Sequence, residues 1–258
     1  MCLILFAFGH HPRYPLIVAA NRDEFYSRAA APAAFWEDVP DLLAGRDLVG
    51  GGTWFGVKRS GRFAAITNYR NPGFQRFDAP SRGRIVTDFL RGGEAPADYL
   101  AKLSKNAHRY NGFSVIVGDL RRLFYFSNRN GTSRELCPGM YGLSNHLLDT
   151  AWPKIDKGKK ALAKLLSTGK DFAPADLFKI LADPSRPPDH ELPDTGVGLE
   201  WERPLASLFI TTSVYGTRSS TVLLADKEGR VLFEERTFDR KPELWKSVRY
   251  EFEIEPLV

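Results

Sequence analysis

The second residue of the chain, Cys2, is the first candidate for chemistry, because it stands directly behind Met1 at the head of the apolar stretch CLILFAF. Removal of Met1 would give Cys2 a free α-amine. Such an amine has a pKa of about 7.7–8.0 and can act as the base for a thiol whose pKa is about 8.5. One residue would then supply both nucleophile and base. The alternative is that Cys2 is a small apolar residue packed in a core.

Four polar residues directly follow the second apolar stretch: Asn21, Arg22, Asp23 and Glu24. The stretches CLILFAF and PLIVAAN are separated only by GHHPRY, which predicts a hairpin of two buried strands. The end of the second strand then lies beside the start of the first. We therefore expect Arg22 and the carboxylates to orient Cys2, while a turn with an internal ion pair is the alternative.

Further candidates occur where other predicted strands begin or end. Asn68 in AITNYRNP and Asn145 in YGLSNHL each stand at a strand end, and Arg218 in GTRSSTVLL stands just before a strand. An acyl-transfer site needs neutral donors for a developing oxyanion, and an Asn amide supplies them. Asn is also a common turn residue, and a solvated position is the alternative for Arg218.

The stretch GRDLVGGGTWFG is rich in glycine but has neither the P-loop nor the dinucleotide-binding spacing. It indicates a close backbone approach beside a ligand pocket, with Gly51, Gly52 and Trp54 as candidate binding residues. His146, which follows Asn145, is a further candidate and could act as the base of a Cys–His pair. The five His residues have no zinc-site spacing, so no metal is expected.

Composition limits the class of protein. The 258 residues carry a formal charge of +5, from 36 basic and 31 acidic residues, which favours at most an anionic ligand and no nucleic acid. The two cysteines exclude a disulfide framework and favour a reducing, cytoplasmic location. The stretch CLILFAF is too short for a secretory signal, and no stretch reaches the roughly 20 apolar residues of a membrane span.

The remaining pattern alternates hairpins with helices. Strands are predicted within 53–71, 113–128, 140–145, 207–239 and 248–254, and helices over 81–93, 95–106, 153–167 and 174–183. Ser81 is expected to cap the first helix, and the lysines from Lys154 to Lys164 are interpreted as a solvated face. Residues 31–52 and 183–204 are expected to be irregular. The order predicts an α+β protein, one domain over residues 1–258, with two antiparallel sheets covered by helices.

Several of these motifs, taken in order, resemble a known family. The initial MC, AANRDEFYSR, GRDLVGGGTWFGV, AITNYRNP, GLSNH and YGTRSSTVLL are similar to the NRDE proteins, the relatives of the transport and Golgi organisation 2 protein. The resemblance runs from the first residue to about residue 225. It implies a four-layer αββα sandwich of the N-terminal-nucleophile hydrolase type, whose enzymatic relatives are the choloylglycine and penicillin V acylases.

The resemblance also implies roles for individual residues. Cys2 would be the nucleophile, Asn68 and Asn145 would stabilise the oxyanion, and Arg218 would support the site. The early Arg and Asp of the acylases correspond either to Arg22 and Asp23 or to the positions of Asn21 and Glu24, and both registers stay open.

Two functions follow from these residues and from the resemblance. The first is a cysteine amidohydrolase or acyl-transfer protein that acts on a small amide or thioester and needs no cofactor. The second is a non-catalytic carrier of haem, acyl-CoA or another lipid, because NRDE relatives are associated with haem trafficking. Neither function predicts an oligomeric state.

Overall fold

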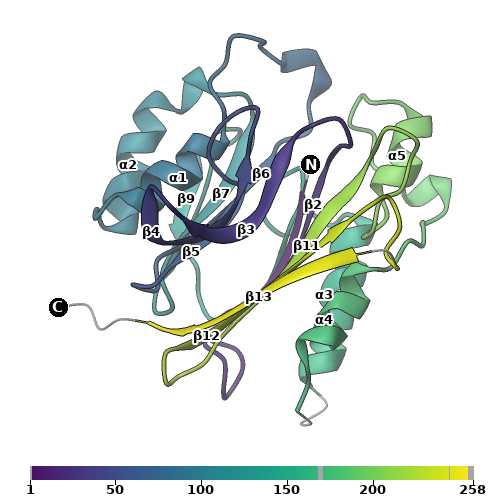
Figure 1. The fold of residues 1–258 in the computed structure, drawn as a ribbon. Helices are drawn as coiled ribbons and strands as arrows, with labels where there is room; N and C mark the ends of the chain where they lie inside the picture. Colours follow the sequence, from purple (N-terminus) through teal and green to yellow (C-terminus); the bar gives the residue numbers. More distant parts are fainter. Residues whose placement is uncertain (1, 168–170, 244, 255–258) are drawn as a thin grey trace.

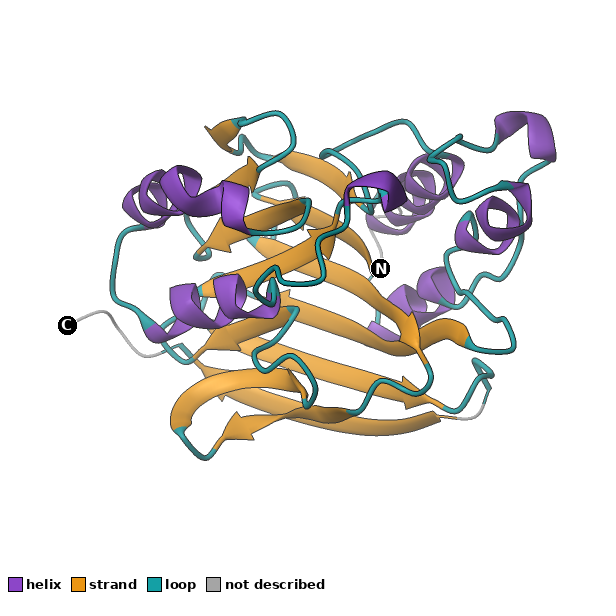
Figure 2. Ribbon diagram, turned by 90° about the horizontal axis from the view of Figure 1, so that it is seen from above, coloured by secondary structure: helices purple, strands orange, loops and turns teal. Residues whose placement is uncertain are grey.

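The computed structural model describes residues 2–167, 171–243 and 245–254 and consists of two antiparallel sheets packed face to face between helices (Figures 1 and 2). In the described residues one sheet has six strands in the order β10-β1-β2-β11-β12-β13, and the other has seven in the order β3-β4-β5-β6-β7-β8-β9. The predicted αββα sandwich is therefore confirmed.

The strands of the six-stranded sheet are β1 (Cys2–Phe8), β2 (Leu16–Phe25), β10 (Gly139–Leu143), β11 (Tyr215–Ala225), β12 (Arg230–Phe238) and β13 (Trp245–Glu253). Those of the seven-stranded sheet are β3 (Ala30–Trp36), β4 (Val39–Asp47), β5 (Phe55–Lys58), β6 (Phe63–Asn68), β7 (Phe113–Gly118), β8 (Leu123–Ser127) and β9 (Ser133–Glu135). The α-helices are α1 (Gly83–Arg91), α2 (Pro96–Asn106), α3 (Pro153–Leu166), α4 (Pro174–Leu181) and α5 (Leu199–Leu205).

The core has three apolar layers, and strand β1 shows why. Ile4, Phe6 and Phe8 point between the sheets, whereas Leu3 and Leu5 point toward the helices, because successive side chains of a strand alternate between its faces. Both faces are buried, so the whole strand is apolar. Truncating a fully buried ring such as that of Phe6 to Ala would cost about 3–5 kcal/mol.

The helices cover the outer faces of the sandwich. Apolar residues of α1 and α2, among them Val86 and Phe89, pack on the seven-stranded sheet. Those of α3 and α4, among them Ile155 and Leu177, pack on the six-stranded sheet. Figure 1 shows the two helix pairs on opposite sides of the strands. Among the described residues, no helix is long and apolar enough to span a membrane.

Three expectations from the sequence are wrong. Residues 31–52 are not irregular but contain nearly all of β3 and β4; β3 is an edge strand, where Pro32 is tolerated because its missing N–H costs no ladder hydrogen bond. Residues 183–204 include the 3₁₀ turn Asp189–Glu191 and most of α5. Ser81 does not cap α1 with its side chain; its carbonyl oxygen accepts the N–H of Arg84.

Candidate active site

A cleft of about 500 Å³ opens at one end of the sandwich, and Cys2 lies in its lining. Most of the rest of the lining comes from the end of β2 and the turn after it, the end of β4 and the loop after it, the end of β6, and the start of α1 with the residues before it. It includes Arg22, Asp23, Glu24, Arg28, Asp47, Gly50, Trp54, Asn68, Arg82 and Arg84. Cys2 is thus a partly buried residue that borders the cleft.

The hairpin of β1 and β2 places the thiol opposite an arginine. Cys2 pairs directly with Arg22 in the antiparallel register, which confirms the predicted hairpin. Burial raises the pKa of the Cys2 thiol, while the Arg22 guanidinium and the backbone N–H of Asp23 act in the opposite direction. The backbone of Cys2 is held by Ser144, whose hydroxyl donates to the Cys2 carbonyl at 3.1 Å.

The four polar residues at the end of β2 divide between the two faces of the sheet. Asn21 points toward the helices, where its amide donates to the carbonyls of Leu181 and Leu208 at 2.9 and 2.8 Å and its oxygen accepts from Ser220 at 2.5 Å. Arg22, Asp23 and Glu24 contribute to the lining of the cleft. Asn21 therefore lies outside the cleft and joins α4 to the sheet.

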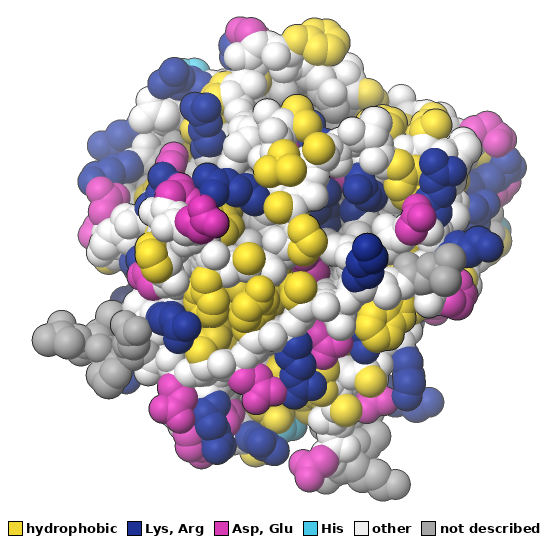
Figure 3. Space-filling model, in the orientation of Figure 1, with side chains coloured by type: hydrophobic (Ala, Val, Ile, Leu, Met, Phe, Trp, Pro, Cys, Tyr) yellow, Lys and Arg dark blue, Asp and Glu magenta, His cyan; other side chains and the backbone are white. Residues whose placement is uncertain are grey.

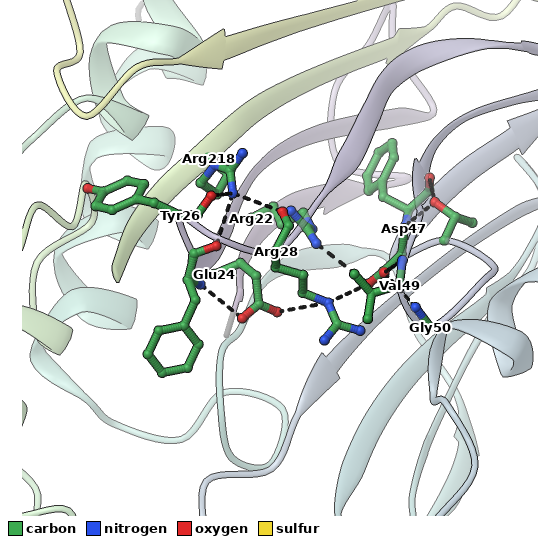
Figure 4. A network of polar contacts seen from close by, with 11 residues as sticks. Arg22, Glu24, Tyr26, Arg28, Asp47, Val49, Gly50 and Arg218 are labelled. Carbon is green, nitrogen blue, oxygen red and sulfur yellow. Dashed lines mark hydrogen bonds and ion pairs between the residues drawn. The ribbon is translucent and has the colours of Figure 1, made fainter. Parts of the chain in front are cut away.

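Arg22 is fixed by contacts from the other sheet. Its guanidinium carbon lies 4.2 Å from the Trp54 ring centroid, and Nη2 lies 3.6 Å from Oδ2 of Asp47. Oδ2 of Asp47 also accepts from Nε of Arg28 at 2.8 Å, and Arg28 lies 3.7 Å from Glu24 (Figure 4). Only 5 % of the Arg22 side chain is exposed, so this cation is held rigidly opposite Cys2.

Asp47 is the anchor of this network. Its Oδ1 accepts the backbone N–H groups of Val49 and Gly50 at 3.0 and 2.9 Å. Burial alone would raise the pKa of Asp47, but these N–H groups and Arg28 outweigh burial and lower it. Asp47 therefore stays ionised and keeps both arginines in place.

A layer of buried charges lies behind the cleft. Oδ1 of Asp23 accepts from the Thr217 hydroxyl at 2.7 Å; burial raises the pKa of Asp23, and Lys154 opposes that effect. Lys154 is only 2 % exposed, and burial lowers its pKa to about 8. The expectation of a solvated face is thus wrong for Lys154. Arg70 and Glu202 form an ion pair of 2.6 Å in the same layer.

The two candidate oxyanion donors occupy different positions. Asn68 lines the cleft, whereas Asn145 is fully buried and does not appear in the lining. The side-chain amide of Asn145 donates to the backbone carbonyl of Asn68 at 3.1 Å. Asn145 thus supports the strand end that carries Asn68.

Arg218 also lies away from the cleft. It occupies an irregularity in the pairing of β11 with β2, between Thr217 and Ser219. Its Nη1 donates to the carbonyls of Phe25, Tyr26 and Arg28 at 3.0–3.1 Å (Figure 4). Arg218 therefore holds the turn that carries Arg28, and its effect on the cleft is indirect.

The predicted ligand-binding residues are also only partly in the cleft. Trp54 lines it, but Gly51 and Gly52 do not; Gly50, which was not among the predicted residues, lines it instead. Gly52 has a φ of +84°, and a Cβ there would lie 2.6 Å from the carbonyl oxygen of Gly83, so the expected close backbone approach is real and joins the loop to α1. His146 is not in the lining: its ring nitrogens contact Tyr69 Oη at 2.5 Å and Thr150 Oγ1 at 2.8 Å.

Several charged residues of this region were not predicted from the sequence, among them Arg28, Asp47, Arg82, Arg84 and Lys154. Arg28 and Asp47 stand inside the quoted motifs AANRDEFYSR and GRDLVGGGTWFGV, which is the signal that could have found them. Arg82 lines the cleft, and burial lowers its pKa to about 10. No group of three or more His, Cys, Asp or Glu side chains suited to a metal ion occurs within the described ranges.

The two-sheet sandwich has the fold of solved proteins of the N-terminal-nucleophile hydrolase type. A mutant of the conjugated bile acid hydrolase from Clostridium perfringens superposes with a TM-score of 0.55 and 8% identity over 98% of this chain and 92% of that chain. The Caenorhabditis elegans ortholog of N-acylethanolamine-hydrolyzing acid amidase superposes with a TM-score of 0.50 and 12% identity, covering 86% and 92% of the two chains.

The chain belongs to the Transport and Golgi organisation 2 family, whose model matches residues 1–240. The Transport and Golgi organization protein 2 homolog of Bos taurus is 38% identical over 99% of this chain and 100% of its own length. The homolog of Homo sapiens is 37% identical with the same coverage, and the Drosophila melanogaster protein is 31% identical over 92% of each chain. The family expected from the motifs is thereby confirmed.

Proposed function

We propose that the protein is a cysteine amidohydrolase or acyl-transfer enzyme that acts on a small amide or thioester carrying an anionic group. The observation that carries the proposal is the position of Cys2 in the lining of an arginine-rich cleft, paired with Arg22. The fold supports it, since both solved neighbours carry hydrolase or amidase names.

The chemistry begins with removal of Met1. The α-amine of Cys2 would accept the thiol proton, and the thiolate would attack the substrate carbonyl. Asn68 is the candidate donor to the oxyanion, because it lines the cleft. The leaving amine or thiol departs with the proton held by the α-amine and leaves a thioester on Cys2. Water, deprotonated by the same amine, then hydrolyses the thioester and regenerates the thiol.

The charges of the cleft favour an anionic substrate. Arg22 and Arg28 are balanced by Asp47 and Glu24. Arg82 and Arg84 line the same cleft, and neither has a carboxylate within 4.0 Å among the described residues. A carboxylate, sulfonate or phosphate of the substrate would provide the missing counter-charge.

The second candidate function is that of a non-catalytic carrier of haem or acyl-CoA. One observation favours it: the amide of Asn145 bonds to the Asn68 carbonyl, and Asn145 does not line the cleft, which leaves Asn68 as the single predicted oxyanion donor there. A carrier needs the anion-binding arginines but no oxyanion donors. Because Cys2 and Cys137 are both free thiols, we propose the reducing cytoplasm as the location for either function.

The test is the turnover of acyl thioesters and acyl amides in matched pairs, with and without an anionic group on the leaving side. The enzyme proposal expects hydrolysis of the anionic members and its loss in Cys2→Ser, while Cys137→Ser, which changes the exposed cysteine, retains it. Saturable binding of the same compounds without turnover, equal in wild type and Cys2→Ser, would support the carrier instead.

A further inference from the structure

A second cavity of about 630 Å³ adjoins the Cys2 cleft. It lies between the start of β3, the irregular part of β11, the end of β12 and the start of β13. Arg22 and Trp54 line both cavities, so their stacked side chains form part of the boundary between them. The volume is in the range of sites that hold a small organic molecule.

The walls of this cavity are largely aromatic and apolar. Trp54, Phe238 and Trp245 provide ring surfaces, and Ala31 and Pro32 complete the side formed by β3. Trp245 is 44 % exposed, although Arg236 covers one face of its ring at 4.1 Å. Figure 3 shows apolar side chains gathered on the face where β3 and β13 lie, with Lys and Arg side chains at their border.

Cations without a carboxylate partner line the same cavity. Arg218 donates to backbone carbonyls, and among the described residues neither Arg218 nor Lys246 has a carboxylate within 4.0 Å. Two acids also belong to the lining. Asp239 carries one charge, whereas Glu235 is buried and accepts the backbone N–H of Ala33 at 2.7 Å.

Glu235 cancels only part of the positive charge of the cavity. Burial raises the pKa of Glu235 to about 7, so the carboxyl is substantially protonated at neutral pH. Arg22 is already paired with Asp47, so Arg218 and Lys246 are the cations that remain opposite Asp239 and a partly protonated Glu235. An aromatic cavity with a surplus of cations is complementary to an aromatic anion.

We propose that this second cavity binds an aromatic carboxylate or sulfonate, with its ring against Trp54 and Trp245 and its charge between Arg218 and Lys246. The site is separate from the cleft in which the substrate of Cys2 would lie. The resemblance implied that Arg218 supports the catalytic site, whereas in the structure Arg218 lines this second cavity.

The test is titration of the purified protein with 2-naphthoate, with the heat of binding measured by isothermal titration calorimetry. We expect one saturable site and an affinity that falls at least about tenfold in Lys246→Glu, where the charge is reversed, and in Trp245→Ala, where a ring is removed. Both residues are exposed, so these variants should fold; their far-UV circular dichroism and thermal midpoints verify this. The uncharged 2-naphthamide should bind at least about tenfold more weakly than 2-naphthoate.

Matched controls distinguish the two cavities. Arg84→Glu, in the Cys2 cleft, and Cys2→Ser should both leave the affinity for 2-naphthoate unchanged, so failure of the proposed catalysis does not affect this result. Loss of binding in Arg84→Glu with retention in Lys246→Glu would place the ligand in the cleft and overturn the proposal. Absence of saturable binding to the wild-type protein would also overturn it.

Discussion

The cleft and the second cavity share the Arg22–Trp54 boundary, but they differ in the residues that surround their cations. In the cleft, Asp47 and Glu24 balance Arg22 and Arg28 beside the thiol, and Arg82 and Arg84 are the cations left for an anionic substrate. In the second cavity, Arg218 and Lys246 line the same walls as aromatic residues and have no carboxylate within 4.0 Å in the described part of the chain. Paired charges hold side chains in place, whereas unpaired charges next to apolar surface favour binding of an anion.

A third arrangement sharpens this contrast. Behind the cleft, Arg70 and Glu202 are paired and both are 4 % exposed, and Glu202 also accepts the backbone N–H of Thr195 at 2.9 Å. This pair attaches α5 and the preceding loop to Arg70, which lies just after the end of β6. This buried ion pair thus serves the architecture around the cleft.

The largest expected effect comes from breaking that buried pair. Glu202→Gln leaves the Arg70 guanidinium buried without its carboxylate and should lower the free energy of unfolding by roughly 3–5 kcal/mol. Urea denaturation followed by circular dichroism measures it. Glu200→Gln is the matched control, because Glu200 is on the same helix and is 86 % exposed. A loss below about 1 kcal/mol, typical of surface pairs, would contradict the structural role.

The next largest effect is on the pH dependence of stability, and it comes from Glu235 in the wall of the second cavity. The pKa of Glu235 is about 7 in the folded protein and 4.5 in its ordinary state, so the folded protein binds the proton more tightly and its stability falls as pH rises from about 4.5 to 7. Glu235→Gln removes this loss. The variant should be more stable than wild type by roughly 2–3 kcal/mol at pH 8 and nearly equal to it at pH 4.5.

Denaturation midpoints at the two pH values test this prediction. Gln can still accept the Ala33 N–H through its side-chain carbonyl, so the hydrogen bond is retained in the variant. The exposed Glu228→Gln serves as control and should show no such pH dependence. Equal stability of Glu235→Gln and wild type at pH 8 would show that Glu235 does not bury a charge.

A smaller effect is expected for Arg22, which forms part of the boundary between the two cavities and acts on the pKa of the Cys2 thiol. Arg22 lowers the pKa of the Cys2 thiol, so Arg22→Met should raise the pH at which Cys2 is alkylated at half its maximal rate by up to about one unit. Iodoacetamide labelling at a series of pH values, read by mass spectrometry, measures the midpoint. Arg91→Met, a change on the exposed end of α1, should leave it in place. An unchanged alkylation midpoint in Arg22→Met would show that Arg22 does not affect the pKa of the Cys2 thiol.

Regular apolar patterns made most of the fold predictable from the sequence. The continuous apolar stretches of β1 and β2 indicated buried strands, and their short connection indicated the hairpin that brings Arg22 to Cys2. Strands β3 and β4 were missed because Pro and Gly interrupt them, which an edge position and a close approach to Trp54 permit. Local pattern alone cannot show such tolerance, since it depends on the neighbouring chain.

The candidate site was predictable only where it is local in sequence. Adjacent strands bring together Cys2, Arg22, Asp23 and Glu24. Their proximity was predicted from the sequence, and all four line the cleft. Asp47 and Lys154 reach it from the end of β4 and from the first turn of α3, so their partners could not be predicted from spacing. Lys154 looks like one of several surface lysines until α3 is docked against the sheet.

The most direct test of the central claim, that Cys2 is the nucleophile of the cleft, is the intact mass of the protein before and after reaction with an electrophilic acyl thioester. The account predicts a chain without Met1 and a single acyl adduct, mapped to Cys2 and absent in Cys2→Ser. A chain that retains Met1, or an adduct found only on Cys137, would contradict it.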